Sequence, residues 1–467
     1  MFNNNTSALP RSRLGIWIGI VVFFQVLLGY WLVVMPLNYL IPVVCLPVLI
    51  SVIYYKPLIS YLSLVFLLPN YGIDLFKIGG DADVSLLEPA IFLACIGLVF
   101  LFIKKPSIRV RFTGTEFAIF LLYFWASFSY FWTPVQMRGL QQVVKVAEGI
   151  VIYFLTTTMI TSRKDFNVVV GAWIGLVMVV SVVGTYQTFT SGFRAAAAYT
   201  FTSGYDKIHR DVRTTALFEG ADMVGFITSL VSVLIITYIL VLPRGRWKTI
   251  LMCSLPLASF TFLTAMSRKS FVAIVGALLV MQLMLKQKFL GRLILILIGS
   301  FIVALTVLLT MGSSGFIDAL KERVMSLFIS PEESIKYRLQ AWDVGIGMFM
   351  QSPLIGRGLG SFYNIAILAG SILTFPHNFY VFIISELGLV GLFFLVFWWF
   401  QIGLQFSKVL KNCANEEIRV IGVGMVGGLV TIAITMAFRS FSLTDPTFWG
   451  YMGLTSAFLK LHYQEVI

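Results

Sequence analysis

The sequence predicts an all-α fold, in which about 12–14 transmembrane helices form one polytopic bundle with a large helical loop outside the membrane. Hydrophobic residues make up 58% of the 467-residue chain and charged residues only 12%, whereas soluble domains contain about 25% charged residues. Apolar runs of about 20 residues recur along the chain, each long enough to cross a membrane as a helix. Basic residues cluster in the short segments between these runs. Together these observations predict a multi-pass membrane protein.

The apolar runs predict the individual helices and leave no room for a separate soluble domain. We therefore expect a single polytopic membrane domain over residues 1–467. The first run follows a basic flank and lacks a small-residue cleavage site, so we expect it to be retained as a span. The runs fall near residues 14–35, 38–55, 57–75, 85–103, 115–132, 140–160, 166–190, 219–242, 249–267, 270–285, 293–311, 377–402, 420–438 and 447–463.

The basic clusters predict the orientation of the chain. Short cytoplasmic loops are rich in Lys and Arg, and placing both termini in the cytoplasm puts these clusters on that side. The net charge of +13 is thereby explained by topology, and we expect no nucleic-acid partner. The clusters are Arg11/Arg13, Lys104/Lys105/Arg109/Arg111, Arg163/Lys164, Arg244/Arg246/Lys248, Lys286/Lys288/Arg292 and Lys408/Lys411/Arg419.

The sequence indicates no metal and no cofactor. Cys45, Cys95 and Cys253 lie inside apolar runs and only Cys413 lies in a hydrophilic loop, so we expect neither disulfides nor a cysteine-ligated metal. The acidic residues outside the spans are scattered among loops. A carboxylate cage for a divalent cation is therefore disfavoured.

This orientation places two longer loops outside, at residues 191–218 and 312–376. Segments 315–329 and 332–352 of the second loop show apolar residues at helical spacing with charges between them, which predicts helices on the membrane surface. Pro353 and the glycines after it end that pattern. Long external loops commonly contain functional residues, so we expect the functional site here.

The external side contains cations that the topology rule does not predict. Guanidinium groups match phosphate oxygens bidentately, which indicates an anionic head group such as a diphosphate as the ligand. The set is Arg194, Lys207, Arg210, Arg213, Arg268, Lys269, Lys321, Arg323, Lys336, Arg338, Arg357 and Arg439.

Three arginines of this set have distinctive surroundings. Arg268 lies in a turn of a few residues between two apolar runs, where a charge is costly and indicates function. The alternative is a turn residue that extends its charge to water. Arg213 precedes the eighth run, and Arg357 lies among three glycines that permit close backbone approach to a ligand. Either could instead be a solvated loop residue.

His377 is one of three histidines and begins an apolar run after Pro376. A histidine can accept a proton near neutral pH, and the outer mouth of a helix is accessible to a polar acceptor. His377 is therefore a candidate general base, and the alternative is a helix cap or interface residue. Glu386, nine residues further, is expected to face the bundle interior as a structural polar contact.

Four stretches occur in an order that resembles the O-antigen ligase and O-antigen polymerase superfamily of bacterial membrane glycosyltransferases. They are RTTALFEGADMVGFI, SRKSFVAIVGALL, YRLQAWDVGIGMFMQSPLIGRGLGSF and HNFYVFIISELGLVG. In the last, the spacing of His377, Asn378, Gly388 and Gly391 follows that of the family. The chain has FEGAD where the family often has a proline-asparagine pair.

The resemblance implies a C-type glycosyltransferase fold that acts at the periplasmic face of the inner membrane without nucleotide sugar or metal. Arg213 and Arg268 match arginines that hold the donor diphosphate, and His377 matches the histidine that activates the acceptor. Arg338 and Arg357 lie in the loop motif and are further candidates for substrate binding. The expected reaction inverts the anomeric centre.

The implied partners are an undecaprenyl-diphosphate-linked glycan donor, a glycan or lipid A core acceptor, and membrane lipids. A chain-length-regulator protein is a further candidate partner. Whether the chain is a ligase or a polymerase stays open. The rival function is a transporter or flippase for lipid-linked glycans, which predicts charges deep in several helices. Apart from Lys145 and Glu148, a candidate mid-span pair, the polar residues gather at one face and favour an enzyme over a transporter or a structural subunit.

Overall fold

The computed structural model describes residues 50–70, 74–78, 82–85, 87–108, 112–190, 216–218, 220–265, 267–288, 291–292, 333–439 and 443–463. The predicted spans at 14–35 and 293–311, most of the span at 38–55, and most of the loop at 191–218 lie outside these residues. Arg213 also lies outside them.

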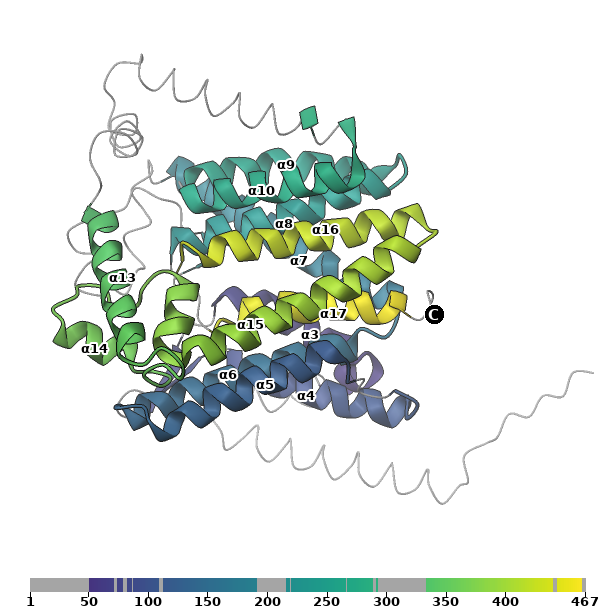
Figure 1. Ribbon diagram of the computed structural model, residues 1–467. Helices are drawn as coiled ribbons and strands as arrows, with labels where there is room; N and C mark the ends of the chain where they lie inside the picture. Colours follow the sequence, from purple (N-terminus) through teal and green to yellow (C-terminus); the bar gives the residue numbers. More distant parts are fainter. Residues whose placement is uncertain are drawn as a thin grey trace, which may run out of the picture.

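The described chain is a bundle of α-helices with one short β-hairpin (Figure 1). Six of the described helices, α4, α7, α8, α10, α15 and α16, are long and apolar enough to cross a membrane, which confirms the predicted all-α polytopic class. The helices are α3 Leu58–Leu67, α4 Leu87–Lys104, α5 Gly114–Phe128, α6 Gln136–Met159, α7 Arg163–Thr190, α8 Ala221–Val241, α9 Arg246–Thr264, α10 Arg268–Leu285, α13 Glu333–Gln351, α14 Phe362–Leu368, α15 Phe379–Asn412, α16 Glu416–Met436 and α17 Pro446–Tyr463.

The span predicted at 57–75 is wrong in its second half. Helix α3 has only 10 residues and passes into a short 3₁₀ helix at Leu68–Asn70. Strand β1, Asp74–Ile78, then pairs antiparallel with β2, Ala82–Ser85. Pro69 has no amide hydrogen with which to continue the helical hydrogen bonds, and Asn70 is a turn former. These turn residues override the hydrophobicity on which the prediction was based.

The helix predicted at 377–402 is longer than expected and contains a break. Helix α15 extends to Asn412, and Gly388 inside it has non-helical φ and ψ angles of 67° and −164°. A residue at positive φ interrupts the backbone hydrogen bonds of a helix. The short first part of α15 therefore begins close to His377, and the longer second part runs through the bundle.

The bundle has two chemically different ends. Helices α13 and α14 lie at the ends of the long helices, on the left in Figure 1, and we call this the α13 end. At the opposite end, Arg163 Nη2 is 2.6 Å from Glu417 Oε1 and Lys105 Nζ is 3.3 Å from Thr161 Oγ1. The helices alternate in direction, so the described basic clusters at the loops after α4, α6, α8, α10 and α15 all lie at this opposite end.

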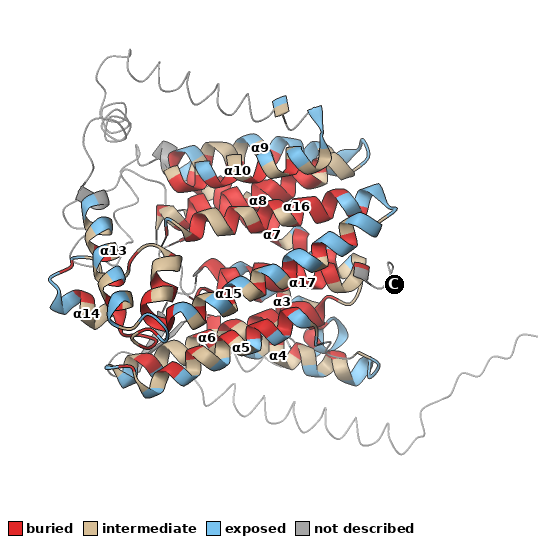
Figure 2. Cartoon of the chain, viewed as in Figure 1, coloured by how far each residue is buried: buried red, intermediate tan, exposed pale blue. Residues whose placement is uncertain are grey.

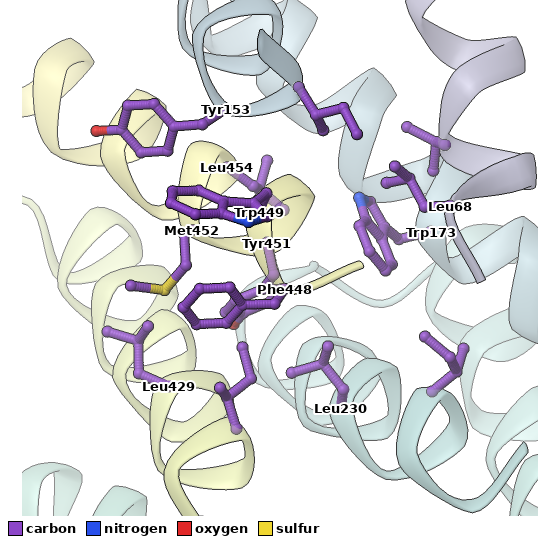
Figure 3. Close-up of a cluster of buried hydrophobic side chains, with 14 of the residues drawn as sticks. Leu68, Tyr153, Trp173, Leu230, Leu429, Phe448, Trp449, Tyr451, Met452 and Leu454 are labelled. Atoms are coloured by element: carbon purple, nitrogen blue, oxygen red, sulfur yellow. The ribbon is translucent and has the colours of Figure 1, made fainter. Parts of the chain in front are cut away.

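The largest cluster of buried apolar residues includes α17 and many of its neighbouring helices. Buried residues concentrate on α8, α16 and α17 in Figure 2. In Figure 3, Phe448, Trp449 and Tyr451 of α17 face residues of several neighbouring helices. The Trp449 ring stacks on Trp398 of α15 with ring centroids 5.3 Å apart. These aromatic contacts place α17 at the centre of the bundle.

Helices α6 and α17 pack closely because glycines face the partner helix. A Cβ at Gly149 of α6 would overlap the indole of Trp449, and one at Gly453 of α17 would overlap Thr156. Small residues let helix backbones approach in a membrane, where hydrophobicity alone does not drive helix association. The close contact fixes the central helix against α6.

Replacing Gly149 with alanine should lower the thermal midpoint of the purified protein in detergent. The added methyl group must displace the Trp449 indole, and overpacking a filled core costs about 1–3 kcal/mol. Gly171→Ala on α7 is the matched control, because a Cβ there has no atom within 4 Å. Equal midpoints for the two variants would contradict this packing.

Candidate functional site

His377 is held in place by backbone contacts on both sides. Its φ angle is 49°, in the left-handed region that few non-glycine residues adopt. On one side, Trp342 Nε1 of α13 donates to the Pro376 carbonyl oxygen at 2.7 Å. On the other, the Asn378 side chain caps α15 by accepting from the amides of Tyr380 and Val381. The imidazole therefore has a defined position at the start of α15.

His377 lies among charged groups that come from several helices. Burial, together with the positive charges of Arg338 and Lys269, lowers its pKa to about 4. Asp222 opposes this effect, and Arg439 adds to it. A cation disfavours a second positive charge nearby. The imidazole of the unliganded protein is therefore neutral at neutral pH and can accept a proton.

Lys269 and Asp222 form a close ion pair at the α13 end. Lys269 Nζ lies 2.5 Å from Asp222 Oδ2, and the Lys269 side chain is 7% exposed. Asp222 belongs to the first turn of α8, where the helix dipole stabilises a carboxylate. Lys269 is the second residue of α10. The pair therefore ties the ends of two helices together beside His377.

Arg439 lies in the turn after α16 and is also buried. Its guanidinium lies over the Phe226 ring of α8, 5.1 Å from the ring centroid. Its Nη1 is 4.0 Å from Asp445 Oδ2 at the start of α17. An aromatic ring and a carboxylate both stabilise a buried guanidinium. Arg439 thus brings a positive charge from the α16–α17 turn to the same end.

We call His377, Arg338, Lys269, Asp222 and Arg439 the cationic cluster. Two of the predicted site residues, His377 and Arg338, belong to it. Arg268 begins α10 next to Lys269 and is half-buried. From the sequence, Lys269 and Arg439 are predicted only as members of the wider set of cations outside the membrane, and Asp222 is not predicted. An acidic residue in the first turn of α8 was the available signal.

Arg357 lies in a different part of the α13 end, on a glycine loop at residues 352–361. The loop packs on the break in α15: the Arg357 amide donates to Ser385 O at 3.0 Å and the Gly358 amide donates to Glu386 O at 2.8 Å. Among the hydrogen bonds of the described residues, Arg357 Nε is a buried donor without an acceptor. The side chain of Arg357 is thus a candidate ligand-binding group apart from the cationic cluster.

The glycines of this loop permit close approach to protein backbone. Gly356, Gly358 and Gly360 all have positive φ, and a Cβ at Gly356 or Gly360 would overlap the backbone of α15 or α6. These glycines were predicted to permit close approach of a ligand. In the structure the space is filled by neighbouring helices, because the loop is packed into the end of the bundle.

Glu386 organises the glycine loop, as its predicted interior position indicated. The buried carboxylate accepts from the Gly360 amide and from the Phe362 amide, both at 2.8 Å. These bonds satisfy backbone donors at the start of α14 that have no partner within the helix. Glu386 therefore has a structural role in joining α14 and the loop to α15.

The predicted pair of Lys145 and Glu148 exists and includes a third residue. Lys145 Nζ lies 2.6 Å from Glu88 Oε1 and 3.0 Å from Glu148 Oε2. The three residues join α4 to α6, and the Lys145 side chain is 43% exposed. Among the described residues, no group of three or more His, Cys, Asp and Glu side chains is arranged to hold a metal ion.

The fold and the site define a polytopic helical membrane protein with a cationic cluster around a neutral histidine at one end. Residues 252–396 match the sequence model of the O-antigen ligase family, which confirms the resemblance to the O-antigen ligase and polymerase superfamily. The matched segment contains Arg268, Arg338, Arg357 and His377 and begins after Arg213. A search of curated proteins finds no match to the chain. Residues 252–396 are therefore similar to O-antigen ligases, and the apolar helices are those of a membrane protein.

Replacing Gly388 with alanine should destabilise the protein and expose the glycine loop to proteolysis. Alanine is strained at a φ of 67°, and a Cβ there would overlap the Leu354 carbonyl group. Gly403→Ala in the same helix is the control, because a Cβ at Gly403 meets nothing within 4 Å. Thermal unfolding and limited proteolysis of both variants in detergent measure the effect. A Gly388→Ala protein as stable as Gly403→Ala would show that the break in α15 is dispensable.

Proposed function

We propose that the protein transfers a glycan from undecaprenyl diphosphate to an acceptor hydroxyl, without a metal, as an O-antigen or exopolysaccharide polymerase or an O-antigen ligase. The observation that supports this most is the neutral, half-buried His377 beside the cations Arg338, Lys269 and Arg439. A proton acceptor and several cations at one helix end match the two chemical requirements of the reaction. The family match covers Lys269, Arg338 and His377.

The cations bind the diphosphate of the donor in this proposal. Arg268, Arg338, Arg213 and Arg357 are the proposed ligands, since guanidinium groups bind phosphate oxygens in pairs. As the bond between the anomeric carbon and the phosphate oxygen breaks, its electron pair moves to the diphosphate. The cations stabilise the negative charge that develops on the leaving group.

His377 accepts the proton of the acceptor hydroxyl as the new bond forms. The acceptor oxygen attacks the anomeric carbon opposite the diphosphate, so the proposed reaction inverts that centre. The proton moves to the imidazole, and the diphosphate leaves with the electron pair. No covalent enzyme intermediate is required, because the stabilised diphosphate is a good leaving group.

The distribution of basic residues supports a periplasmic site in the inner membrane. The basic clusters lie at the end opposite α13, and the topology rule places such clusters in the cytoplasm. The α13 end, with residues 312–376 as its large loop and 191–218 as a second loop, then faces the periplasm. Both termini are cytoplasmic in this arrangement of a single membrane domain.

Reconstitution of the purified protein in liposomes tests the proposal. A defined undecaprenyl-diphosphate glycan is supplied as donor, with lipid A core and a second lipid-linked repeat unit as competing acceptors. Extension of either acceptor supports glycan transfer and separates ligase from polymerase. Movement of the donor across the bilayer without any glycosidic bond formation would instead support a transporter.

Replacing His377 with alanine should abolish transfer, with a loss of at least about 100-fold in kcat, because general-base catalysis contributes about 10²–10⁴-fold. His462→Ala is the matched control, since His462 is a buried histidine that contacts Phe458 near the end of α17. Both variants are compared for membrane yield and initial transfer rate. Transfer near the wild-type rate by His377→Ala rules out the base assignment.

The pH dependence of transfer should report the titration of His377. A general base works only when deprotonated, so kcat/KM should fall as the pH falls through the pKa of about 4 in the unliganded protein. The bound diphosphate adds negative charge, which raises the pKa of the imidazole. We therefore expect the acid limb of kcat at higher pH than that of kcat/KM. Coincident acid limbs would show that the diphosphate does not bind near His377.

A further inference from the structure

We propose that Lys269 is a further phosphate-binding residue of the site and that Asp222 positions it. This inference rests on the proposed function, because the ligand that we assign to Lys269 is the diphosphate of the donor. It adds two residues to the proposed arginines and gives them different roles. Lys269 contacts the ligand, whereas Asp222 acts through Lys269.

The burial of Lys269 requires a reason. Its side chain is 7% exposed at the start of a membrane-spanning helix, where an ammonium group loses most of its hydration. Asp222 is 37% exposed and supplies the compensating charge at 2.5 Å. A lysine at a helix end normally extends its flexible side chain to water. Here the ion pair holds it inside.

Lys269 retains hydrogen-bonding capacity for a ligand. An ammonium group has three N–H donors, and within the described part of the chain Lys269 Nζ donates one hydrogen bond, to Asp222. Among the same residues, the other two donors have no acceptor, and they can bind oxygens that enter from the α13 end. A buried cation with unused donors is suited to bind an anion.

The surrounding charges determine which ligand fits. Arg338 and Arg439 act electrostatically on both Lys269 and His377. These three cations outnumber the two acidic residues paired with them, Asp222 and Asp445. The excess positive charge favours an anionic ligand and disfavours a neutral sugar or a cation. A diphosphate group fits this requirement and is the leaving group of the proposed reaction.

Two roles of Asp222 can be distinguished by experiment: a negative charge in the site, and a residue that positions Lys269. As a charge alone it would repel a diphosphate, and removing it would strengthen binding. As a positioning residue it fixes the flexible lysine side chain before the ligand arrives, which reduces the entropy lost on binding. The two roles predict opposite effects for Asp222→Asn. We infer that positioning dominates, because the pair is short and Lys269 is buried.

The test measures donor binding separately from transfer. Wild-type protein, Lys269→Met, Lys269→Arg and Asp222→Asn are reconstituted in lipid nanodiscs. Undecaprenyl diphosphate without a glycan serves as the binding probe, and the glycan-linked donor serves for kinetics. We expect Lys269→Met to weaken probe binding and to raise the donor KM by about tenfold, as loss of one charged hydrogen-bonding group does. Lys269→Arg should restore most of the affinity, and Asp222→Asn should weaken probe binding about threefold to tenfold.

Lys460→Met is the control for loss of a buried ion pair. Lys460 Nζ of α17 lies 3.0 Å from Glu116 Oε1 of α5, and both side chains are mostly buried. Lys460 lies near the end of α17, away from the cationic cluster at the α13 end. This variant should lower the thermal midpoint and leave probe affinity and donor KM unchanged. If Lys460→Met shifts the donor KM as much as Lys269→Met does, the effect of Lys269→Met is explained by lower stability. That result would overturn the inference.

The possible outcomes separate this inference from the proposed function. Unchanged probe binding in Lys269→Met, or tighter binding in Asp222→Asn, overturns the inference even if the wild-type protein transfers glycan. Absence of transfer by the wild-type protein contradicts the proposed function. Probe binding by Lys269→Met and Asp222→Asn then still decides the role of Lys269. If Lys269→Met does not fold, the change in probe affinity of Asp222→Asn decides: weaker binding supports the inference, and tighter binding overturns it.

Discussion

The break at Gly388 is the constraint on which the candidate site depends. A continuous α15 would satisfy its own backbone hydrogen bonds and leave no partner for the glycine loop. Because the helix is interrupted, the Ser385 and Glu386 carbonyl groups accept from Arg357 and Gly358, and the Pro353 carbonyl accepts from the Leu389 amide. Irregular backbone in a membrane protein is tolerated where such protein groups surround it. These hydrogen bonds between the loop and the break in α15 join the glycine loop to the bundle.

The same joint fixes the position of His377. The first part of α15 contains Glu386, which accepts from the start of α14, while Trp342 of α13 binds the Pro376 carbonyl. Helices α13 and α14 are thereby held against the start of α15, and Arg338 of α13 lies close enough to influence the imidazole. The segment with α13 and α14 thus forms a fixed wall of the site, because its hydrogen-bond partners belong to α15 and to the residue that precedes its N-cap.

The sequence was sufficient for the class of fold but not for the whole site. Hydropathy and charge identified the helix bundle and its two ends, and periodicity identified α13. Hydropathy failed at residues 57–75, where the α-helix ends before Pro69 and Asn70, and it ended α15 too early because residues 403–412 are amphipathic. His377 and Arg338 were predictable from charge and position. The contacts of Asp222 and Arg439 could not be predicted. They depend on how α8, α10, α13 and the α16–α17 turn pack together at one end of the bundle.

The electrostatics of the cluster link donor binding to base strength. In the unliganded site, burial and the cations keep His377 a weak base, with a pKa of about 4. Under the proposed function, the diphosphate neutralises the cations and removes part of the cause of that low pKa. The imidazole then becomes a stronger base only when the donor is present. A base that is activated by its own substrate can take a proton from the acceptor in the complete complex, and the same cations that hold the donor keep the empty site unreactive.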